Sequence, residues 1–269
     1  MQLTVQGQTA YAYTGGKPFD ATLPCVVFIH GALHDHSVWT LLARWCAHHG
    51  NSVLAVDQPG HLRSAGPLQP SVQALADWTL ALLDAAGVGA DQTTAVVGHS
   101  MGSLIALEMA ARAPRRICRL VMVGTAYPMK VSDGLLNAAA NIPGAGMDMV
   151  NAFSLSTLAA KPSYPGPGMW LHGGNRHLMG QVQAGNDQVN VFAHDFQLCN
   201  AYANGLQAAA GVQCPVHFVL GAADQMTSPK ATREIATALK AQVHMVPGGH
   251  GLMQEQPDAV LAALRLALA

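Results

Sequence analysis

The feature that most constrains the fold is a series of short apolar runs separated by segments with helical spacing. Unbroken apolar runs are typical of strands covered on both faces, whereas a strand with one wet face alternates apolar and polar residues. Strands that alternate with helices favour an α/β domain with a mostly parallel sheet and helices on both of its faces. The runs that we expect to form these strands are 24–31, 52–57, 95–100, 119–126, 215–221 and 241–248.

The alternation stops between about residues 127 and 206. This stretch is rich in Gly, Asn, Met and Pro and contains helical patches but no clear strand. We therefore expect one domain in three parts, with core residues 1–126 and 207–269 and a helical insertion, 127–206, that forms a lid. A separately folding second domain is the alternative.

Composition argues against several classes of partner. The chain carries a formal net charge of −1 and only 11% charged residues, so it lacks the basic face that a nucleic acid needs. We find no apolar run near 18 residues and no basic-then-apolar leader pattern, so we expect no membrane partner. Five scattered cysteines without C-x-x-C spacing indicate reduced thiols and a cytoplasmic protein.

The strand at 95–100 ends in a serine that has a glycine two residues away on each side. Gly98, Ser100 and Gly102 form the pattern G-x-S-x-G, and a helical segment follows directly. Small residues at these positions allow a chain to reverse sharply from strand to helix with a strained residue between them. The pattern predicts an exposed serine hydroxyl at the start of a helix, where the helix dipole favours negative charge.

Two more polar residues follow later strands directly. Asp224 comes after the strand at 215–221, and His250 comes after the strand at 241–248 in a glycine-rich turn. A serine needs a base to take its proton, and the base needs a third group to fix its tautomer. Since such groups gather at the carboxyl ends of parallel strands, we expect Ser100, Asp224 and His250 to meet there. The chain order Ser, Asp, His is that of an α/β-hydrolase triad.

The sequence resembles the α/β-hydrolase family over nearly its whole length, and in particular its lidded, esterase-like subgroup. The segments that carry the resemblance occur in the family's order: HGA at 30–32, DQPGHLRS at 57–64, GHSMG at 98–102, GAAD at 221–224 and GGHG at 248–251. The chain departs from the family pattern at Leu62, where the family has glycine, and this departure concerns the local turn.

The resemblance implies a role for each site residue. Ser100 would be the nucleophile, His250 the general base and then acid, and Asp224 the carboxylate that orients the histidine. The backbone N–H groups of Ala32 and Met101 would form the oxyanion hole.

Other polar residues in these segments have competing interpretations. His34 and His36, in the cluster HDH with His61 and Asp57 nearby, invite a zinc hypothesis, but their spacing matches no established ligand pattern. We expect both to begin a helix at the pocket entrance, and we expect neither a metal nor a nucleotide cofactor. His30 and His99 lie inside the motifs, and we interpret them as packing and hydrogen-bonding residues.

The sparse charge and many methionines of the 127–206 segment predict an apolar pocket for a small or medium neutral acyl compound. Leu33, Trp170 and Met226 are our candidate lining residues. A carboxylic ester is the favoured substrate, and lactone, thioester and carbon–carbon bond hydrolysis fit the same triad. A haloperoxidase-like perhydrolase and a non-catalytic ligand binder are the rival functions, and the sequence leaves open whether the protein is a monomer or a homodimer.

Overall fold

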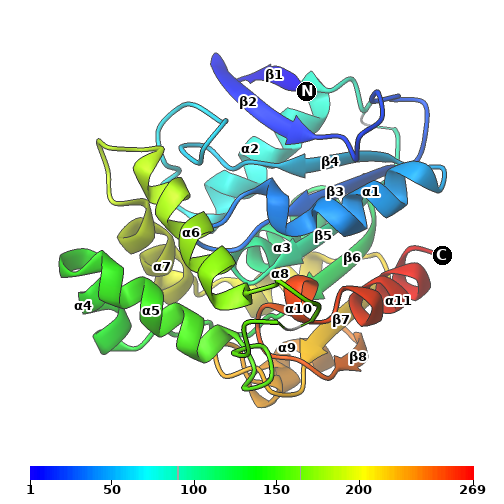
Figure 1. Ribbon diagram of the computed structural model, residues 1–269. Helices are drawn as coiled ribbons and strands as arrows, with labels where there is room; N and C mark the ends of the chain where they lie inside the picture. The colour runs from blue at the N-terminus through cyan, green and yellow to red at the C-terminus, as the bar shows by residue number, and fades with distance from the viewer. Residues whose placement is uncertain (90, 164) are drawn as a thin grey trace.

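The core of the molecule is a twisted sheet crossed by helices, as the computed structural model of residues 1–89, 91–163 and 165–269 describes it (Figure 1). Its strand order is β1-β2-β4-β3-β5-β6-β7-β8. The first two strands pair antiparallel, β2 pairs antiparallel with β4, and all later neighbours are parallel. The strands are β1 Gln2–Val5, β2 Gln8–Tyr13, β3 Cys25–Ile29, β4 Ser52–Val56, β5 Thr94–His99, β6 Ile117–Val123, β7 Val216–Gly221 and β8 Gln242–Val246.

Each face of the sheet is covered by its own helices. Consecutive strand residues point to opposite faces, so in β3 Val27 and Ile29 join one apolar cluster while Val26 and Phe28 join the other. The first cluster packs under α2 Val72–Ala85, α3 Met101–Arg112, α8 Gly205–Gly211 and α9 Arg233–Ala238, and the second under α1 Thr40–His48, α10 Leu252–Glu255 and α11 Pro257–Leu268. The expected α/β class with a mostly parallel sheet is therefore confirmed.

Local signals place the helix ends. Ser71 precedes α2 in extended backbone, and its hydroxyl accepts the N–H of Ala74, which otherwise has no partner in the first turn. Asp35 does the same for the 3-10 helix η1 His36–Trp39, because its carboxylate accepts the N–H of Ser37. A second 3-10 helix, η2 Pro229–Thr232, leads into α9.

In the described part of the chain, four helices lie between β6 and the return to the core at α8. They are α4 Asp133–Asn141, α5 Pro143–Ser154, α6 Leu171–Ala184 and α7 Val191–Ala201. They stand together beside the sheet, at the lower left of the ribbon view (Figure 1). Residues 202–204 separate α7 from α8, and there Tyr202 and Asn204 turn to the buried Glu108 carboxylate of α3.

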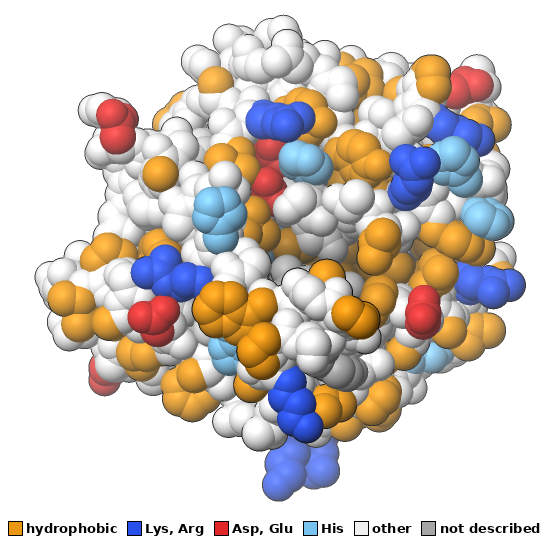
Figure 2. All heavy atoms as spheres, in the orientation of Figure 1, with side chains coloured by type: hydrophobic (Ala, Val, Ile, Leu, Met, Phe, Trp, Pro, Cys, Tyr) orange, Lys and Arg blue, Asp and Glu red, His pale blue; other side chains and the backbone are white. Residues whose placement is uncertain are grey.

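Charged side chains are scattered over the face seen in Figure 2, where single blue or red groups and adjacent blue and red pairs lie among white and orange ones. Among the described residues, none of the helices combines the length and the apolar character needed to cross a bilayer.

Candidate active site

Ser100 occupies a strained turn between β5 and α3. Its backbone φ is 52°, in the left-handed region that an L-residue rarely adopts, with ψ at −121°. The turn is tight because a Cβ at Gly98 would collide with the backbone of Gly102, and a Cβ at Gly102 would collide with the carbonyl of Ile29. Both glycines are therefore required by close backbone contact, and Ser100 is held at the head of α3.

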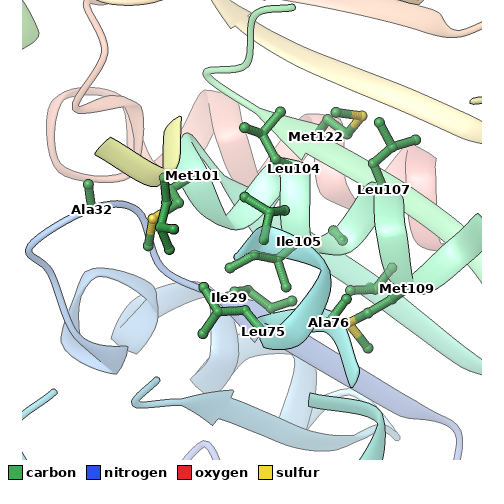
Figure 3. Close-up of a cluster of buried hydrophobic side chains, with 14 of the residues drawn as sticks. Ile29, Ala32, Leu75, Ala76, Met101, Leu104, Ile105, Leu107, Met109 and Met122 are labelled. Carbon is green, nitrogen blue, oxygen red and sulfur yellow. The ribbon is translucent and has the colours of Figure 1, made fainter. Parts of the chain in front are cut away.

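The apolar cluster behind the turn fixes α3 in this position. Met101, the first residue of the helix, points into a cluster with Leu104 and Ile105 of the same helix and Ile29 of β3 (Figure 3). All four side chains are buried completely. The helix therefore cannot shift along its axis without opening the core.

His250 and Asp224 form a buried pair at the ends of β8 and β7. Nδ1 of His250 lies 2.9 Å from Oδ2 of Asp224. The Thr227 hydroxyl lies between them, 2.8 Å from the same carboxylate oxygen and 3.0 Å from the same ring nitrogen. Since Nδ1 faces the carboxylate, Nε2 is the ring nitrogen that remains for the serine.

The surroundings of Asp224 favour its charged form. Burial works against the carboxylate, but the adjacent His250 and hydrogen bonds from Thr227 outweigh it and hold the pKa of Asp224 below its ordinary value. The backbone N–H groups of Met226 and Thr227 donate to its other oxygen, Oδ1. Asp224 is thus fixed as an anion that can orient an imidazole.

The turn at residues 30–32 runs directly against the serine. A Cβ at Gly31 would lie 3.0 Å from the Cβ of Ser100, so only glycine gives this approach without displacing a neighbour. Ala32 lines the same cavity as Ser100. Met101 is the first residue of α3, where backbone N–H groups have no partner within the helix. These two expected donors therefore flank the serine on the β3 and α3 sides.

Ser100 and His250 open into one cavity of about 290 Å³. Its apolar lining comes mainly from residues 129–199, which lie between β6 and β7. The lining residues are Gly31, Ala32, His34, His99, Ser100, Met129, Lys130, Val131, Ser132, Leu135, Met149, Val150, Phe153, Ser154, Phe196, Cys199, Gln225, Met226, Thr227 and His250.

The three candidate lining residues end in different places. Met226 lies in the wall of this cavity. The expectation for Leu33 is wrong, because its φ of 55° belongs to a turn that leaves its side chain fully buried in the core. The expectation for Trp170 is also wrong. Its ring folds onto Gly173 of α6 and is 58% exposed, so it lines outer surface grooves instead.

The motif histidines make defined hydrogen bonds. His99 is buried, and its Nε2 lies 3.0 Å from the carbonyl of His250, with the two imidazole rings 4.6 Å apart. Burial holds the pKa of His99 well below its ordinary value. His34 lines the cavity and places Nε2 2.8 Å from the Asn175 side-chain oxygen. Leu62, the departure from the family pattern, adopts a φ of 38°, which glycine would adopt without strain.

We expected His36 at the cavity entrance, but it does not line the cavity. Its Nδ1 lies 2.7 Å from Oδ1 of Asp57, and its backbone N–H donates to the same oxygen at 2.9 Å. Asp35, His36 and Asp57 together present three atoms of ligand type within 4.8 Å of one another. These residues are the part of the described chain that could hold a metal ion.

Sequence reasoning missed two groups. Thr227 follows Asp224 by three residues in a turn, a position where a hydroxyl commonly faces a carboxylate, so the signal was present but weak. Asp195 of α7 contacts His61 and Leu33 from more than a hundred residues away. No local pattern reports such a contact.

Comparisons with known proteins agree with this geometry. The model of the alpha/beta hydrolase family matches residues 26–263. A protein of Mycobacterium phage D29 with the provisional name non-heme haloperoxidase is 25% identical over 260 residues, which are 90% of this chain and 87% of the relative.

Solved structures show the same fold. The enol-lactonase from Burkholderia xenovorans LB400 superposes with a TM-score of 0.83 at 21% identity, covering 100% of this chain and 99% of that one. A thermophilic esterase from Thermogutta terrifontis superposes with a TM-score of 0.81 at 18% identity, covering 100% and 97%. The family match extends over most of the sequence and includes the elbow at Ser100. The chain therefore belongs to the alpha/beta hydrolase family.

Proposed function

We propose that the protein is a cofactor-independent serine hydrolase that cleaves carboxylic esters with small or medium, largely apolar acyl groups. The observation that carries this proposal is the 2.9 Å contact of the buried Asp224 with His250, which lines the same cavity as Ser100 at its strained strand–helix turn. A serine at such a turn is presented to substrate, and an imidazole held by a carboxylate is the base that activates it.

The reaction has two halves. His250 accepts the proton of Ser100 through Nε2 as the serine oxygen attacks the ester carbonyl, and it then returns that proton to the leaving alcohol. In the second half His250 takes a proton from water, which attacks the acyl-enzyme, and Ser100 regains its proton as the acid leaves. Asp224 keeps the Nδ1 proton in place and stabilises the imidazolium in both halves.

The backbone N–H groups of Ala32 and Met101 would bind the oxygen that becomes negative in each tetrahedral intermediate. The position of Ala32 in the cavity wall and of Met101 at the start of α3 supports this role. A helix start adds a partial positive charge at the same point.

The substrate class follows from the lining. Met129 lies just before α4, and Leu135 lies within it. Met149, Val150 and Phe153 belong to α5. The 127–206 segment therefore supplies most of the apolar wall. This supports its role as a lid over the site. A cavity of about 290 Å³ lies at the lower end of the range for small-molecule sites, which favours short acyl groups.

Perhydrolysis is a second candidate, because the phage relative with the haloperoxidase name matches along nearly its full length. Peroxide in place of water would attack the same acyl-enzyme. Lactone, thioester and carbon–carbon bond cleavage use the same first half-reaction and belong in the same substrate screen.

The test begins with a small fluorophosphonate and intact-mass measurement of the wild type, Ser100→Ala and His250→Ala. We expect one adduct on the wild type, none on Ser100→Ala and very slow labelling of His250→Ala. Unlabelled enzyme is then assayed for hydrolysis of a panel of p-nitrophenyl esters, lactones and thioesters, with and without peroxide. A wild type that takes no label yet binds esters tightly would support the ligand binder and contradict the proposal.

A further inference from the structure

A second carboxylate–imidazole pair lies outside the triad. Asp195 of α7 places Oδ2 2.9 Å from Nε2 of His61, which follows β4. Asp195 is 1% exposed and His61 is 2% exposed, so both groups have left water almost completely. The two residues are 134 positions apart, and their contact joins the helical segment to the core.

The contacts of His61 make this contact an ion pair. Its second nitrogen, Nδ1, lies 3.1 Å from the carbonyl of Pro59, so both ring nitrogens face oxygen acceptors. A neutral imidazole has only one N–H, and both bonds form only when the ring is protonated. Although burial opposes the charge, Asp195 outweighs it and raises the pKa of His61. Asp57 and His30 are the other titratable groups that face this ring.

The adjacent histidine, His30, is uncharged. The His30 ring lies 5.1 Å from that of His61, and its Nε2 accepts the backbone N–H of Gln58. Burial lowers the pKa of His30 to about 4, and the nearby His61 adds to that effect. The two rings, tilted by 53° to each other, therefore carry one positive charge, on the ring that faces Asp195.

The same carboxylate oxygen reaches the turn beside the serine. Oδ2 of Asp195 also accepts the backbone N–H of Leu33 at 2.8 Å. Leu33 directly follows Ala32 and has a φ of 55°, so its peptide belongs to an unusual turn that needs an external partner. Oδ1 faces His194 at 3.2 Å on the far side. One anion thus holds both His61 and the peptide next to the expected oxyanion donor.

We propose that Asp195, held by His61, is a positioning residue that fixes the oxyanion-hole peptide at Ala32 from helix α7. The inference rests on the proposed function, because it assigns work to the Ala32 N–H. It makes assembly of the oxyanion hole depend on correct seating of the helical segment.

A purely structural role would not require this arrangement. A buried ion pair is a weak source of stability compared with apolar side chains of the same size. Misplacement of a catalytic group by about 1 Å, in contrast, costs roughly 100-fold in rate. Asp195 accepts a hydrogen bond from the peptide after Ala32, so its loss should act mainly on the reaction rate through the position of that peptide.

The test compares the affinity for a ligand that forms a tetrahedral adduct with the affinity for a ligand that resembles the ground state. Asp195→Leu removes the acceptor for Leu33, whereas Asp195→Asn removes the charge and keeps an oxygen for it. A trifluoromethyl ketone forms a tetrahedral adduct with serine and places an oxyanion in the hole, and the matched methyl ketone serves as its ground-state counterpart. Each variant is measured for kcat, KM and the affinity of both ketones, per folded molecule.

We expect Asp195→Leu to lower kcat by about 30- to 100-fold and to reduce the affinity for the trifluoromethyl ketone by a similar factor. KM and methyl ketone affinity should stay within about threefold. Asp195→Asn should recover only part of the loss, because its amide keeps an oxygen for the Leu33 N–H but no longer forms an ion pair with His61. The matched control is Glu108→Leu with Glu108→Gln, since Glu108 is also buried and also ties the helical segment to the core through Tyr202 and Asn204.

The control should lose stability while its ratio of the two ketone affinities stays at the wild-type value. If Asp195→Leu yields no folded protein, the Asp195→Asn ratio decides, and it must fall by more than about threefold relative to Glu108→Gln. An unchanged ratio in the folded Asp195 variant overturns the inference. A wild type that neither hydrolyses esters nor takes the fluorophosphonate overturns the proposed function instead, so the two failures are distinct.

Discussion

The Thr227 hydroxyl contacts both atoms of the hydrogen bond between Asp224 and His250. Its O–H donates to Asp224 at 2.8 Å, and its oxygen lies 3.0 Å from Nδ1 of His250. A hydrogen bond to a charged group contributes about 1.5–3 kcal/mol, which is at least tenfold in rate if the imidazolium forms only in the transition state. We expect Thr227→Val to lower kcat about tenfold with KM little changed, and Thr227→Ser to retain wild-type kcat. Equal kcat for the valine and serine variants in ester assays would show that the hydroxyl has no part in catalysis.

Asp35, His36 and Asp57, the residues that could hold a metal ion, give a second prediction, which concerns metal removal. Nδ1 of His36 and Oδ1 of Asp57 are already engaged with each other at 2.7 Å, and Oδ1 of Asp35 caps η1, although Oδ2 of Asp57 is buried without a hydrogen-bond partner among the described residues. A metal would have to displace the His36–Asp57 hydrogen bond. We expect dialysis against EDTA to leave ester hydrolysis unchanged, with the wild type in metal-free buffer as the control. Activity that disappears with EDTA and returns with zinc would instead assign a metal to this cluster.

At the scale of elements, the meeting point of β3, β5 and α3 has no room for a side chain at Gly102. A Cβ there would also lie 2.6 Å from the carbonyl oxygen of His30, and backbone atoms cannot move aside as a flexible side chain can. We expect Gly102→Ala to lower the free energy of unfolding by at least about 3 kcal/mol. The matched control is Gly134→Ala in α4, where a Cβ meets nothing within 4 Å, and it should stabilise by about 0.5–1 kcal/mol. Urea unfolding of both variants checks the prediction, which fails if the two changes have the same sign.

Helix α5 sets the width of the cavity. Val150 is 4% exposed and lines the cavity from this helix, so a larger side chain there takes volume from the proposed acyl site. We expect Val150→Phe to lower kcat/KM for p-nitrophenyl octanoate at least about tenfold and that for the acetate less than about threefold. Val189→Phe, on an exposed surface of the same segment, is the control and should change neither value. A uniform loss on both esters would mean that Val150 does not bound the acyl group.

The elements themselves were predictable because their signals are local. The apolar runs, the Ser71 cap and the order of the motifs depend on neighbours in the sequence, and β3 to β8 lie where those runs predict them. The outward turn of Trp170 and the burial of Leu33 depend on tertiary packing, so composition could not give them. The Asp195–His61 contact depends on how α7 is seated against the core, and no sequence periodicity encodes that distance.

At the scale of the whole molecule, buried histidines make folding depend on pH. A group whose pKa is lower in the folded state contributes stability above its unfolded pKa, and that stability is lost as the pH falls toward the folded value. Burial lowers the pKa of His30 to about 4 and that of His99 well below the ordinary value of 6.5. His61 has the opposite sign, because its raised pKa stabilises the fold below pH 6.5 and that stability is lost as the pH rises through the folded pKa.

The two lowered pKa values outweigh the one raised value between pH 7.5 and 4.5, a window in which the carboxylates with lowered pKa stay charged. The shift at His30 alone corresponds to about 2–3 kcal/mol of unfolding free energy lost across this window. We expect urea unfolding to show a steady loss of stability on acidification. In His30→Gln the fold should be weaker at pH 7.5, but its slope with pH should be shallower by roughly that same amount. A slope as steep as that of the wild type would mean that His30 is protonated in the native state, and the adjacent His30 and His61 rings would then carry two positive charges beside Asp195.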